Sequence, residues 1–318
     1  MDKYYLGIDV GSVSTDLVLI NQERKIVDKV YLRTKGQPIK ILKKGLNKIA
    51  ANNSDLEIGG VATTGSGRNL AGVIVGADAI KNEITAHAVG ASNYRPDVET
   101  VLEIGGQDSK IIIIRDGVAV DFAMNSVCAA GTGSFLDQQA SRLEIPIEEF
   151  GTYALKTKNP VRIAGRCSVF AESDMIHKQQ MGHGIPEIIA GLCDAMVRNY
   201  LNNVAKGKTI EAPVIFQGGV AANIGIKRSF EKELGVEIIV PENYEVMGAL
   251  GAAILGQETS WKKKGETAFK GFDLTNFNYR AESFECDGCP NRCEIINIYQ
   301  NDELIARWGG KCPRWEAV

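Results

Sequence analysis

The stretch YYLGIDVGSVSTDLVLI, residues 4–20, decides the fold. It contains an apolar strand, a tight turn that holds Asp9 and Gly11, and a second apolar strand. Residues 100–117, TVLEIGGQDSKIIIIRDG, repeat this plan with two glycines and Asp108 in the turn. Two short apolar runs around a small turn predict a β-hairpin. The chain therefore has two related hairpins whose turns carry a carboxylate and free backbone N–H groups.

Helical segments follow both hairpins and complete two similar α/β halves, joined near residues 95–99. Residues 38–52 and 131–144 have the apolar spacing of helices, and so do residues 185–205, with Pro186 near their start. Two later segments each predict a strand followed by a helix, and the last helix contains closely spaced glycines and alanines that allow another backbone to approach. These two segments are residues 212–235 and 236–258.

Length and composition are those of a globular protein with a sizeable core. The chain has 318 residues, of which 44% are hydrophobic and 24% charged, and its formal net charge is -3. Nucleic-acid partners usually require a basic excess, so none is expected. No apolar run approaches the roughly 20 residues of a membrane span, and the first residues enter a strand directly without a signal-peptide pattern. We expect a cytoplasmic protein without a membrane partner.

The turns of the two hairpins predict a nucleotide site. Glycine lets backbone N–H groups approach phosphate closely. Asp9 and Asp108 are expected to face each other across a cleft and to hold Mg²⁺ through water. Gln107 or Asp108 is expected to orient an attacking water. Gly218 and Gly219, in QGGVAAN, would let adenine or ribose lie on the backbone.

Six motifs, taken in chain order, resemble the ATP-dependent activators of 2-hydroxyacyl-CoA dehydratases and the related ATPase subunits of benzoyl-CoA reductases. They are GIDVGS, TGSGRN, IGGQDSK, MNSVCAAGTGSFLD, CSVFAES and GGVAANIG, and they cover about residues 4–256. The resemblance implies two duplicated ATPase domains of the actin/hexokinase/Hsp70 type, of the ribonuclease H-like class. It implies ATP or ADP and Mg²⁺ as ligands. It also implies a homodimer that holds one [4Fe-4S] cluster between its subunits.

The resemblance further implies which residues serve the site. Cys128 and Cys167 would be the cluster ligands, two from each subunit. Asp9, Gln107 and Asp108 would act at the phosphates. Nucleotide contacts fall on Gly11, Ser12, Ser14, Gly105, Gly106, Gly131, Thr132, Gly133, Gly218 and Gly219.

Helix starts suit the two thiols for physical reasons. A helix N-terminus carries roughly half a positive charge and free N–H groups, which favour a thiolate and a reduced cluster. One chain offers two such cysteines, and two chains offer the four thiolates that a [4Fe-4S] cluster commonly takes. Activators often carry a lysine where this chain has Asp16, so Lys110 or Arg166 is expected to supply the missing positive charge.

Four of the seven cysteines gather after residue 285 and predict a metal site. They are Cys286, Cys289, Cys293 and Cys312. The first pair has zinc-ribbon spacing, whereas the close third cysteine also fits iron–sulfur use. A second [4Fe-4S] cluster and Zn²⁺ both stay open.

The domain organisation follows from these features. Residues 1–97 form the first ATPase subdomain, completed by about 240–257, and residues 98–239 form the second, with the cluster helices. Residues 258–271 are a linker and residues 272–318 a cysteine-rich module.

The predicted function is ATP-driven injection of low-potential single electrons into an iron–sulfur dehydratase or reductase, with a donor such as ferredoxin or flavodoxin. A sugar or acetate kinase of the same fold, or an actin-like scaffold with structural metal, are the alternatives. Neither alternative accounts for Cys128 and Cys167.

Overall fold

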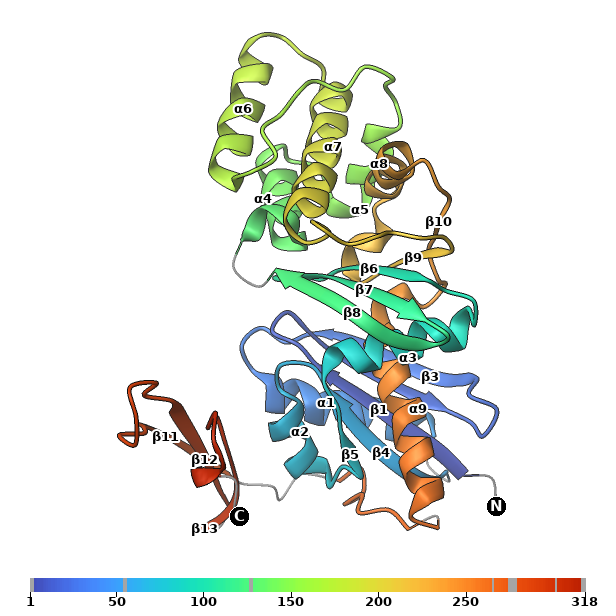
Figure 1. The fold of residues 1–318 in the computed structure, drawn as a ribbon, viewed down its shortest axis with the longest axis vertical. Helices are drawn as coiled ribbons and strands as arrows, with labels where there is room; N and C mark the ends of the chain where they lie inside the picture. Colours follow the sequence, from blue (N-terminus) through green and yellow to red (C-terminus); the bar gives the residue numbers. More distant parts are fainter. Residues whose placement is uncertain are drawn as a thin grey trace.

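The computed structural model describes residues 3–53, 56–125, 128–264, 266–273, 279–300 and 302–315. In these residues two five-stranded sheets, each packed with helices, form two halves stacked along the long axis of the molecule (Figure 1). A three-stranded sheet near the C-terminus lies beside the first half. Within the described ranges no helix is long and apolar enough to cross a membrane.

The sheet of the first half has the order β3-β2-β1-β4-β5, in which β1 pairs antiparallel with β2 and parallel with β4. Both faces of this sheet are covered, so its central strands are apolar on both sides. Leu6 and Ile8 pack toward α1 and α2, and Tyr5 and Val18 pack toward α9. The elements are β1 (Lys3–Val10), β2 (Ser14–Ile20), β3 (Ile26–Arg33), α1 (Pro38–Asn52), β4 (Glu57–Thr64), α2 (Arg68–Val75), β5 (Ala79–Ile80) and α3 (Glu83–Tyr94).

The second half repeats the plan with the order β10-β9-β6-β7-β8. Here β6 pairs antiparallel with β7 and parallel with β9, as β1 does with β2 and β4. The predicted duplication of a hairpin followed by a parallel strand is therefore present. The elements are β6 (Thr100–Ile104), β7 (Ser109–Arg115), β8 (Val118–Asn125), η1 (Ala129–Gly131), α4 (Gly133–Arg142), α5 (Ile147–Ala154), α6 (Ser168–Gln180), α7 (Ile185–Asn203), β9 (Val214–Gln217), η2 (Gly219–Ala222), α8 (Ile224–Leu234) and β10 (Ile238–Ile239).

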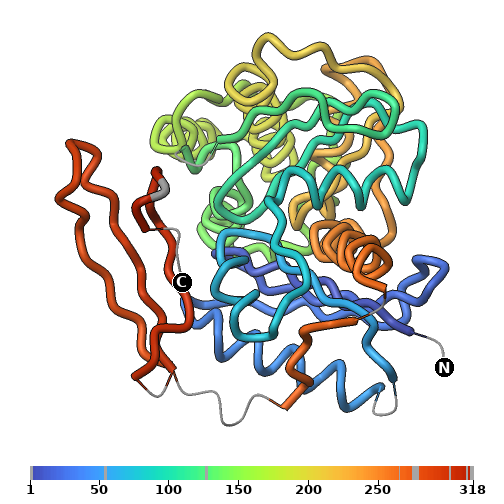
Figure 2. Tube along the Cα trace, turned by 60° about the horizontal axis from the view of Figure 1, so that its bottom comes forward, coloured from blue at the N-terminus to red at the C-terminus, as the bar shows by residue number. Residues whose placement is uncertain are grey.

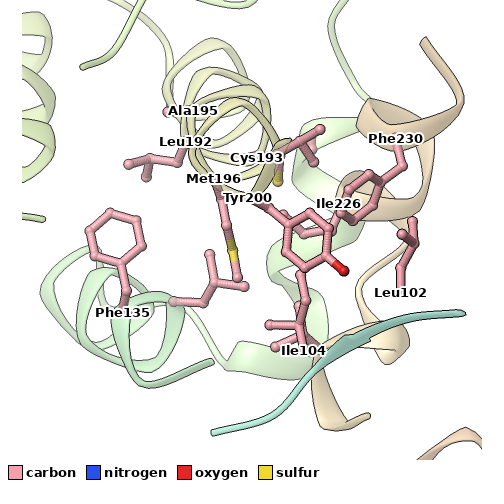
Figure 3. Packing of buried hydrophobic residues seen from close by; sticks show 14 of the residues in the cluster. Leu102, Ile104, Phe135, Leu192, Cys193, Ala195, Met196, Tyr200, Ile226 and Phe230 are labelled. Atoms are coloured by element: carbon pink, nitrogen blue, oxygen red, sulfur yellow. The ribbon is translucent and has the colours of Figure 1, made fainter. Parts of the chain in front are cut away.

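Helix α7 forms the centre of the second core. Its apolar side lies between Phe135 of α4, Phe230 of α8 and the strand that carries Leu102 (Figure 3). Tyr200 meets Phe230 edge to face at 5.3 Å, and its hydroxyl donates to the backbone oxygen of Lys110 at 2.5 Å. Cys193 is fully buried in this core.

Helix α9 (Met247–Lys262) follows the short η3 (Tyr244–Val246) and crosses α3. The small residues predicted to permit a close backbone approach do so. A Cβ atom added to Gly251 would overlap the Ala86 carbonyl oxygen and lie 3.0 Å from the Gly90 nitrogen. The crossing lies at the level where the two halves meet (Figure 1).

The C-terminal module consists of β11 (Arg280–Glu285), β12 (Glu294–Gln300), β13 (Glu303–Trp308) and η4 (Pro313–Trp315). Its strands form an antiparallel sheet, which stands out from the body in both overall views (Figures 1 and 2). Ile305 packs against the core of the first half with Phe269 and Phe272 of the preceding segment. The predicted boundaries at 97/98, 239/240, 257/258 and 271/272 stay predictions.

Candidate functional site

The two hairpin turns face a common cleft of about 680 Å³. Each turn is closed by the same backbone hydrogen bond, from Gly11 N to Ser14 O at 2.9 Å and from Gly105 N to Asp108 O at 3.0 Å. Two matched turns on opposite walls give a ligand backbone N–H groups from both halves. Such a pair suits a phosphate chain, because nests of free amides favour anions.

A third glycine turn closes the cleft. Gly218 has φ +87°, a conformation that favours glycine, and an added Cβ would lie 2.5 Å from the Ile104 carbonyl oxygen. Gly219 follows at the start of η2 and also lines the cleft. Because neither glycine has a side chain, this turn offers an exposed backbone surface on which adenine or ribose could lie.

Asp9 lies on the floor of the cleft at the end of β1. Added Cβ atoms at Gly65 and Gly248 would overlap its two carboxylate oxygens, so only glycine fits on either side. Burial, with Glu83 next in effect, raises the pKa of Asp9 to about 7. A carboxylate so placed favours a bound cation, which would restore its charged form.

Lys110 is buried among three carboxylates. Its ammonium group donates to Glu103 and Asp108, both at 2.9 Å, and lies 3.4 Å from Glu83. Desolvation raises the pKa of Glu103 to about 7, although Lys110 lowers it. The carboxylates in turn hold the pKa of Lys110 above its usual value despite burial. Lys110 therefore lies in the cleft as expected, but its positive charge is already paired with Glu83, Glu103 and Asp108. Arg166 does not line the cleft.

His87 of α3 lines the cleft and stays neutral. Its Nδ1 is 2.8 Å from Gln217 Nε2, so Nδ1 accepts and the proton sits on Nε2. Burial and the nearby Lys110 lower the pKa of His87 to about 3. A neutral imidazole here offers one N–H without adding charge.

Cys128 and Cys167 occupy equivalent positions. Cys128 is the N-cap of η1 and Cys167 the N-cap of α6, and both are half-buried. The Asn125 side chain accepts from Cys128 N at 3.0 Å and donates to Cys128 O at 2.9 Å. Asn199 of α7 donates to the Gly165 carbonyl oxygen at 2.5 Å, and its other side-chain atom adjoins Gly131. Asn199 thus hydrogen-bonds the Cys167 loop to α7 and lies beside the Cys128 loop, without a hydrogen bond to it.

A short hydrogen-bonded path joins the cleft to the Cys128 loop. Gly133 N donates to Gly105 O and Ser134 N to Gly106 O, both at 2.9 Å. The Ser134 hydroxyl also donates to Gly106 O at 2.5 Å. The amides that begin α4 therefore hold the glycine turn of the cleft, and α4 follows η1 and Cys128 directly.

Three of the C-terminal cysteines, Cys286, Cys289 and Cys293, lie in the loop between β11 and β12, and Cys312 follows β13. Cys286 N donates to Cys293 O at 2.9 Å. Trp315 Nε1 lies 3.1 Å and Gly288 N 3.4 Å from the Cys286 sulfur. These donors, Trp315 first, lower the pKa of the thiol. Cys289 and Cys312 are exposed.

No three His, Cys, Asp or Glu residues of the described chain lie together so as to hold a metal ion. The iron–sulfur, magnesium and zinc assignments therefore stay predictions. Two half-buried thiols per chain nevertheless match a cluster shared by two chains. Cys286, with two N–H donors on sulfur, matches a thiolate ligand.

Most of the residues predicted for the nucleotide line the cleft. Gly131 and Thr132 do not line it and are buried, with Asn199 of α7 beside Gly131. The lining residues are Asp9, Gly11, Ser12, Ser14, Gly105, Gly106, Gln107, Asp108, Gly133, Gly218 and Gly219.

Several cleft residues were not selected from the sequence. Glu103 is the one charged residue in an otherwise largely apolar strand, which is a usable signal. Glu83 and Tyr31 lie outside the motifs, and only the tertiary fold brings them to the cleft. Further polar examples are Arg33, Asp137, Glu148, Asn223, Tyr244 and Glu245.

Comparison with known proteins supports the fold and the nucleotide site. A model of the BadF/BadG/BcrA/BcrD ATPase family matches residues 6–256. The (R)-2-hydroxyglutaryl-CoA dehydratase activating ATPase of Acidaminococcus fermentans is 36% identical over 267 residues, which are 82% of this chain and 100% of that protein. The crystal structure of component A of this dehydratase has a TM-score of 0.77 at 34% identity, covering 81% of this chain and 99% of that one.

Two further structures are similar. The activator of the 2-hydroxyisocaproyl-CoA dehydratase from Clostridium difficile, with bound ADPNP, has a TM-score of 0.74 at 31% identity, covering 83% of this chain and 97% of that one. A ROK family glucokinase from Streptomyces griseus, with a TM-score of 0.51 at 14% identity, covers 80% of this chain and 99% of its own and shares only the fold. The predicted actin/hexokinase-type fold is confirmed.

Proposed function

Because the chain belongs to the BadF/BadG/BcrA/BcrD ATPase family, we propose that it hydrolyses ATP to activate a partner dehydratase or reductase by single low-potential electrons. The names of the relatives support this, since two are dehydratase activators and one of these was solved with ADPNP. The partner would be an iron–sulfur enzyme, and a ferredoxin or flavodoxin would supply the electrons.

The observation that carries the proposal is the link between cleft and thiol loop. The carbonyls of Gly105 and Gly106 accept from the amides of Gly133 and Ser134. A phosphate that pulls the glycine turn must therefore also pull the start of α4. The same strand that bears Lys110 is tied to α7 through Tyr200, and α7 carries Asn199 between the cysteine loops. A sugar or acetate kinase would not require a link between its phosphate site and a pair of cysteines.

In the cleft, the backbone N–H groups of the two hairpin turns would hold the phosphates. Eight carboxylate side chains line the cleft against Arg33 and Lys110, so a triphosphate needs cations to enter. Asp9 and Asp108 would orient a hydrated Mg²⁺, and Gln107 would position the attacking water. The neutral His87 would leave this charge balance unchanged.

Cys128 and Cys167 would hold a [4Fe-4S] cluster together with the same residues of a second copy. Such a cluster supplies one-electron transfer. The amides at the starts of η1 and α6 would favour the thiolate forms. Val169 and Phe170 beside Cys167 are 67% and 65% exposed, which suits a surface covered in a dimer or by the partner enzyme.

The C-terminal module would bind a second metal through Cys286, Cys289, Cys293 and Cys312. Of the four cysteines, Cys286 is the best placed to bind metal as a thiolate, because two N–H groups already face its sulfur. Zn²⁺ and a second [4Fe-4S] cluster both fit thiolates, and iron and zinc analysis of the purified protein distinguishes them.

The test is anaerobic purification of the full chain and of two variants, Cys128→Ser and Cys193→Ser. The expected wild type is a brown dimer with ATPase activity. Cys128→Ser should lose about four iron atoms per dimer, whereas Cys193→Ser, changed in the core, should keep them. Any iron in the C-terminal module is unaffected by either change and is measured in a Cys286→Ser variant.

A monomer, or an iron content that Cys128→Ser leaves unchanged, contradicts the shared cluster. A colourless protein that phosphorylates a sugar or acetate contradicts the whole proposal. A brown dimer that hydrolyses no ATP supports the shared cluster but contradicts the proposed ATPase activity.

A further inference from the structure

Asp16 is a buried carboxylate in the cleft wall that the nucleotide contacts above do not use. Its side chain is 5% exposed and lines the cleft. One oxygen, Oδ2, accepts from Ser14 at 3.0 Å. The other, Oδ1, is buried and has no hydrogen-bond partner. An unpartnered carboxylate oxygen is costly in a protein interior, so a ligand for it is expected.

The position of Asp16 brings it next to Asp9. The two residues are paired across the antiparallel strands β1 and β2. Directly opposite residues point to the same face, with Cβ atoms about 4.5–5.5 Å apart. Two carboxylates at this separation repel each other unless a proton or a cation lies between them.

Protein cations near this pair already have partners. Among the described residues no lysine or arginine lies within 4.0 Å of either Asp9 or Asp16, whereas Lys29 pairs with Glu245 at 2.8 Å and Arg33 with Asp137 at 3.7 Å. Lys110 is shared by its three carboxylates. The second carboxylate oxygen of Glu245, in the same wall, is also buried and unpartnered.

We propose that Asp16 and Asp9 bind a divalent cation of the Mg²⁺ or Mn²⁺ class before any nucleotide enters, in addition to the ion that accompanies ATP. Oxygen ligands select hard cations, and Mg²⁺ commonly uses one or two carboxylates and keeps several waters. Two carboxylates therefore suffice, although no third acidic ligand is placed beside them. The resident ion gives an acidic cleft a positive charge to meet phosphate, and this role rests on the proposed nucleotide function.

The experiment titrates the metal-free full chain with Mn²⁺ and detects free Mn²⁺ by electron paramagnetic resonance, first without nucleotide and then with ADP. We expect one bound Mn²⁺ per chain without nucleotide and a second with ADP. Asp16→Asn should lose the first ion and keep the one that ADP brings. Glu233→Gln, a change of an exposed carboxylate on α8, should behave as wild type.

Thermal unfolding gives a second readout that does not require nucleotide. Mn²⁺ should raise the Tm of the wild type and of Glu233→Gln, and it should not raise that of Asp16→Asn. Asp16→Lys, which brings its own ammonium group, should likewise lose the response.

Equal Mn²⁺ binding by Asp16→Asn and wild type without nucleotide overturns the proposal. So does wild type that binds no Mn²⁺ until ADP is added, because a proton then occupies the pair. Failure of ADP to bring its own ion instead counts against the nucleotide site and leaves the Asp16 result standing.

Discussion

The crossing of α3 and α9 permits a matched test of how closely the two backbones approach. Gly251 and Gly256 lie in the same helix, and both are buried. Replacement by alanine gains about 1 kcal/mol of helix propensity at either position. The difference in stability between Gly251→Ala and Gly256→Ala therefore reports the packing term alone.

The structure sets the size of that term. A Cβ atom at Gly256 would lie 3.2 Å from the Ala62 nitrogen, so its neighbours must give by a few tenths of an ångström. At Gly251 it would lie 2.6 Å from the Ala86 carbonyl carbon, and ordinary contact begins at 3.4 Å, so the helices must separate by at least 0.8 Å (3.4 minus 2.6). Overpacking of this kind costs about 1–3 kcal/mol. Both neighbours are backbone, which favours the upper part of this range.

We expect Gly251→Ala to be about 2–3 kcal/mol less stable than Gly256→Ala, which corresponds to a Tm lower by about 4–12 °C. Differential scanning calorimetry of the nucleotide-free proteins measures this directly. Equal melting temperatures for the two variants would refute the argument, because they would mean that α3 and α9 do not touch along this surface.

Three further predictions concern charged and thiol groups. Lys110→Met should cost about 3–5 kcal/mol in urea denaturation, because it leaves the buried Glu103 carboxylate without its cation; a loss below about 1 kcal/mol would contradict the burial of the pair. The folded-state pKa of His87, about 3, lies below the unfolded value of roughly 6.5, so stability should fall as pH drops below about 6.5, by up to about 1.4 kcal/mol per pH unit. In His87→Gln, the free energy of unfolding should therefore depend less steeply on pH below about 6.5. An unchanged pH dependence would exclude His87 as its source. Trp315→Phe should raise the pKa of Cys286, since the indole N–H is the main group that lowers it; the thiolate ultraviolet absorbance against pH, compared with Cys286→Ala, measures the shift.

Local chemistry was enough to predict the two hairpins and several of the helices. The segment predicted as a helix over 38–52 is α1, and the apolar spacing of 185–205 gives α7 at Ile185–Asn203. Turn glycines beside apolar runs have few alternative conformations, so such signals are strong. The predicted phosphate residues mostly line one cleft because both turns repeat one local plan.

Residues outside the turns could not be assigned in this way. Gly131 and Thr132 belong to a glycine-rich loop that looks suited to phosphate, yet α7 packs against it and buries it. The amides of Gly133 and Ser134 are taken by the carbonyls of the neighbouring turn. Which of two glycine loops faces the ligand depends on contacts between segments far apart in the chain.

By itself the sequence determined the duplicated hairpins, the glycine turns and the positions of the thiols before helices, because each depends on neighbours along the chain. Only the tertiary structure decided the charge of the cleft. Glu83, Lys110 and Asp16 come from three different elements, and whether each carboxylate has a partner depends on distances and burial that no local pattern contains. Electrostatic energy in a protein interior depends on those two quantities, and folding fixes both.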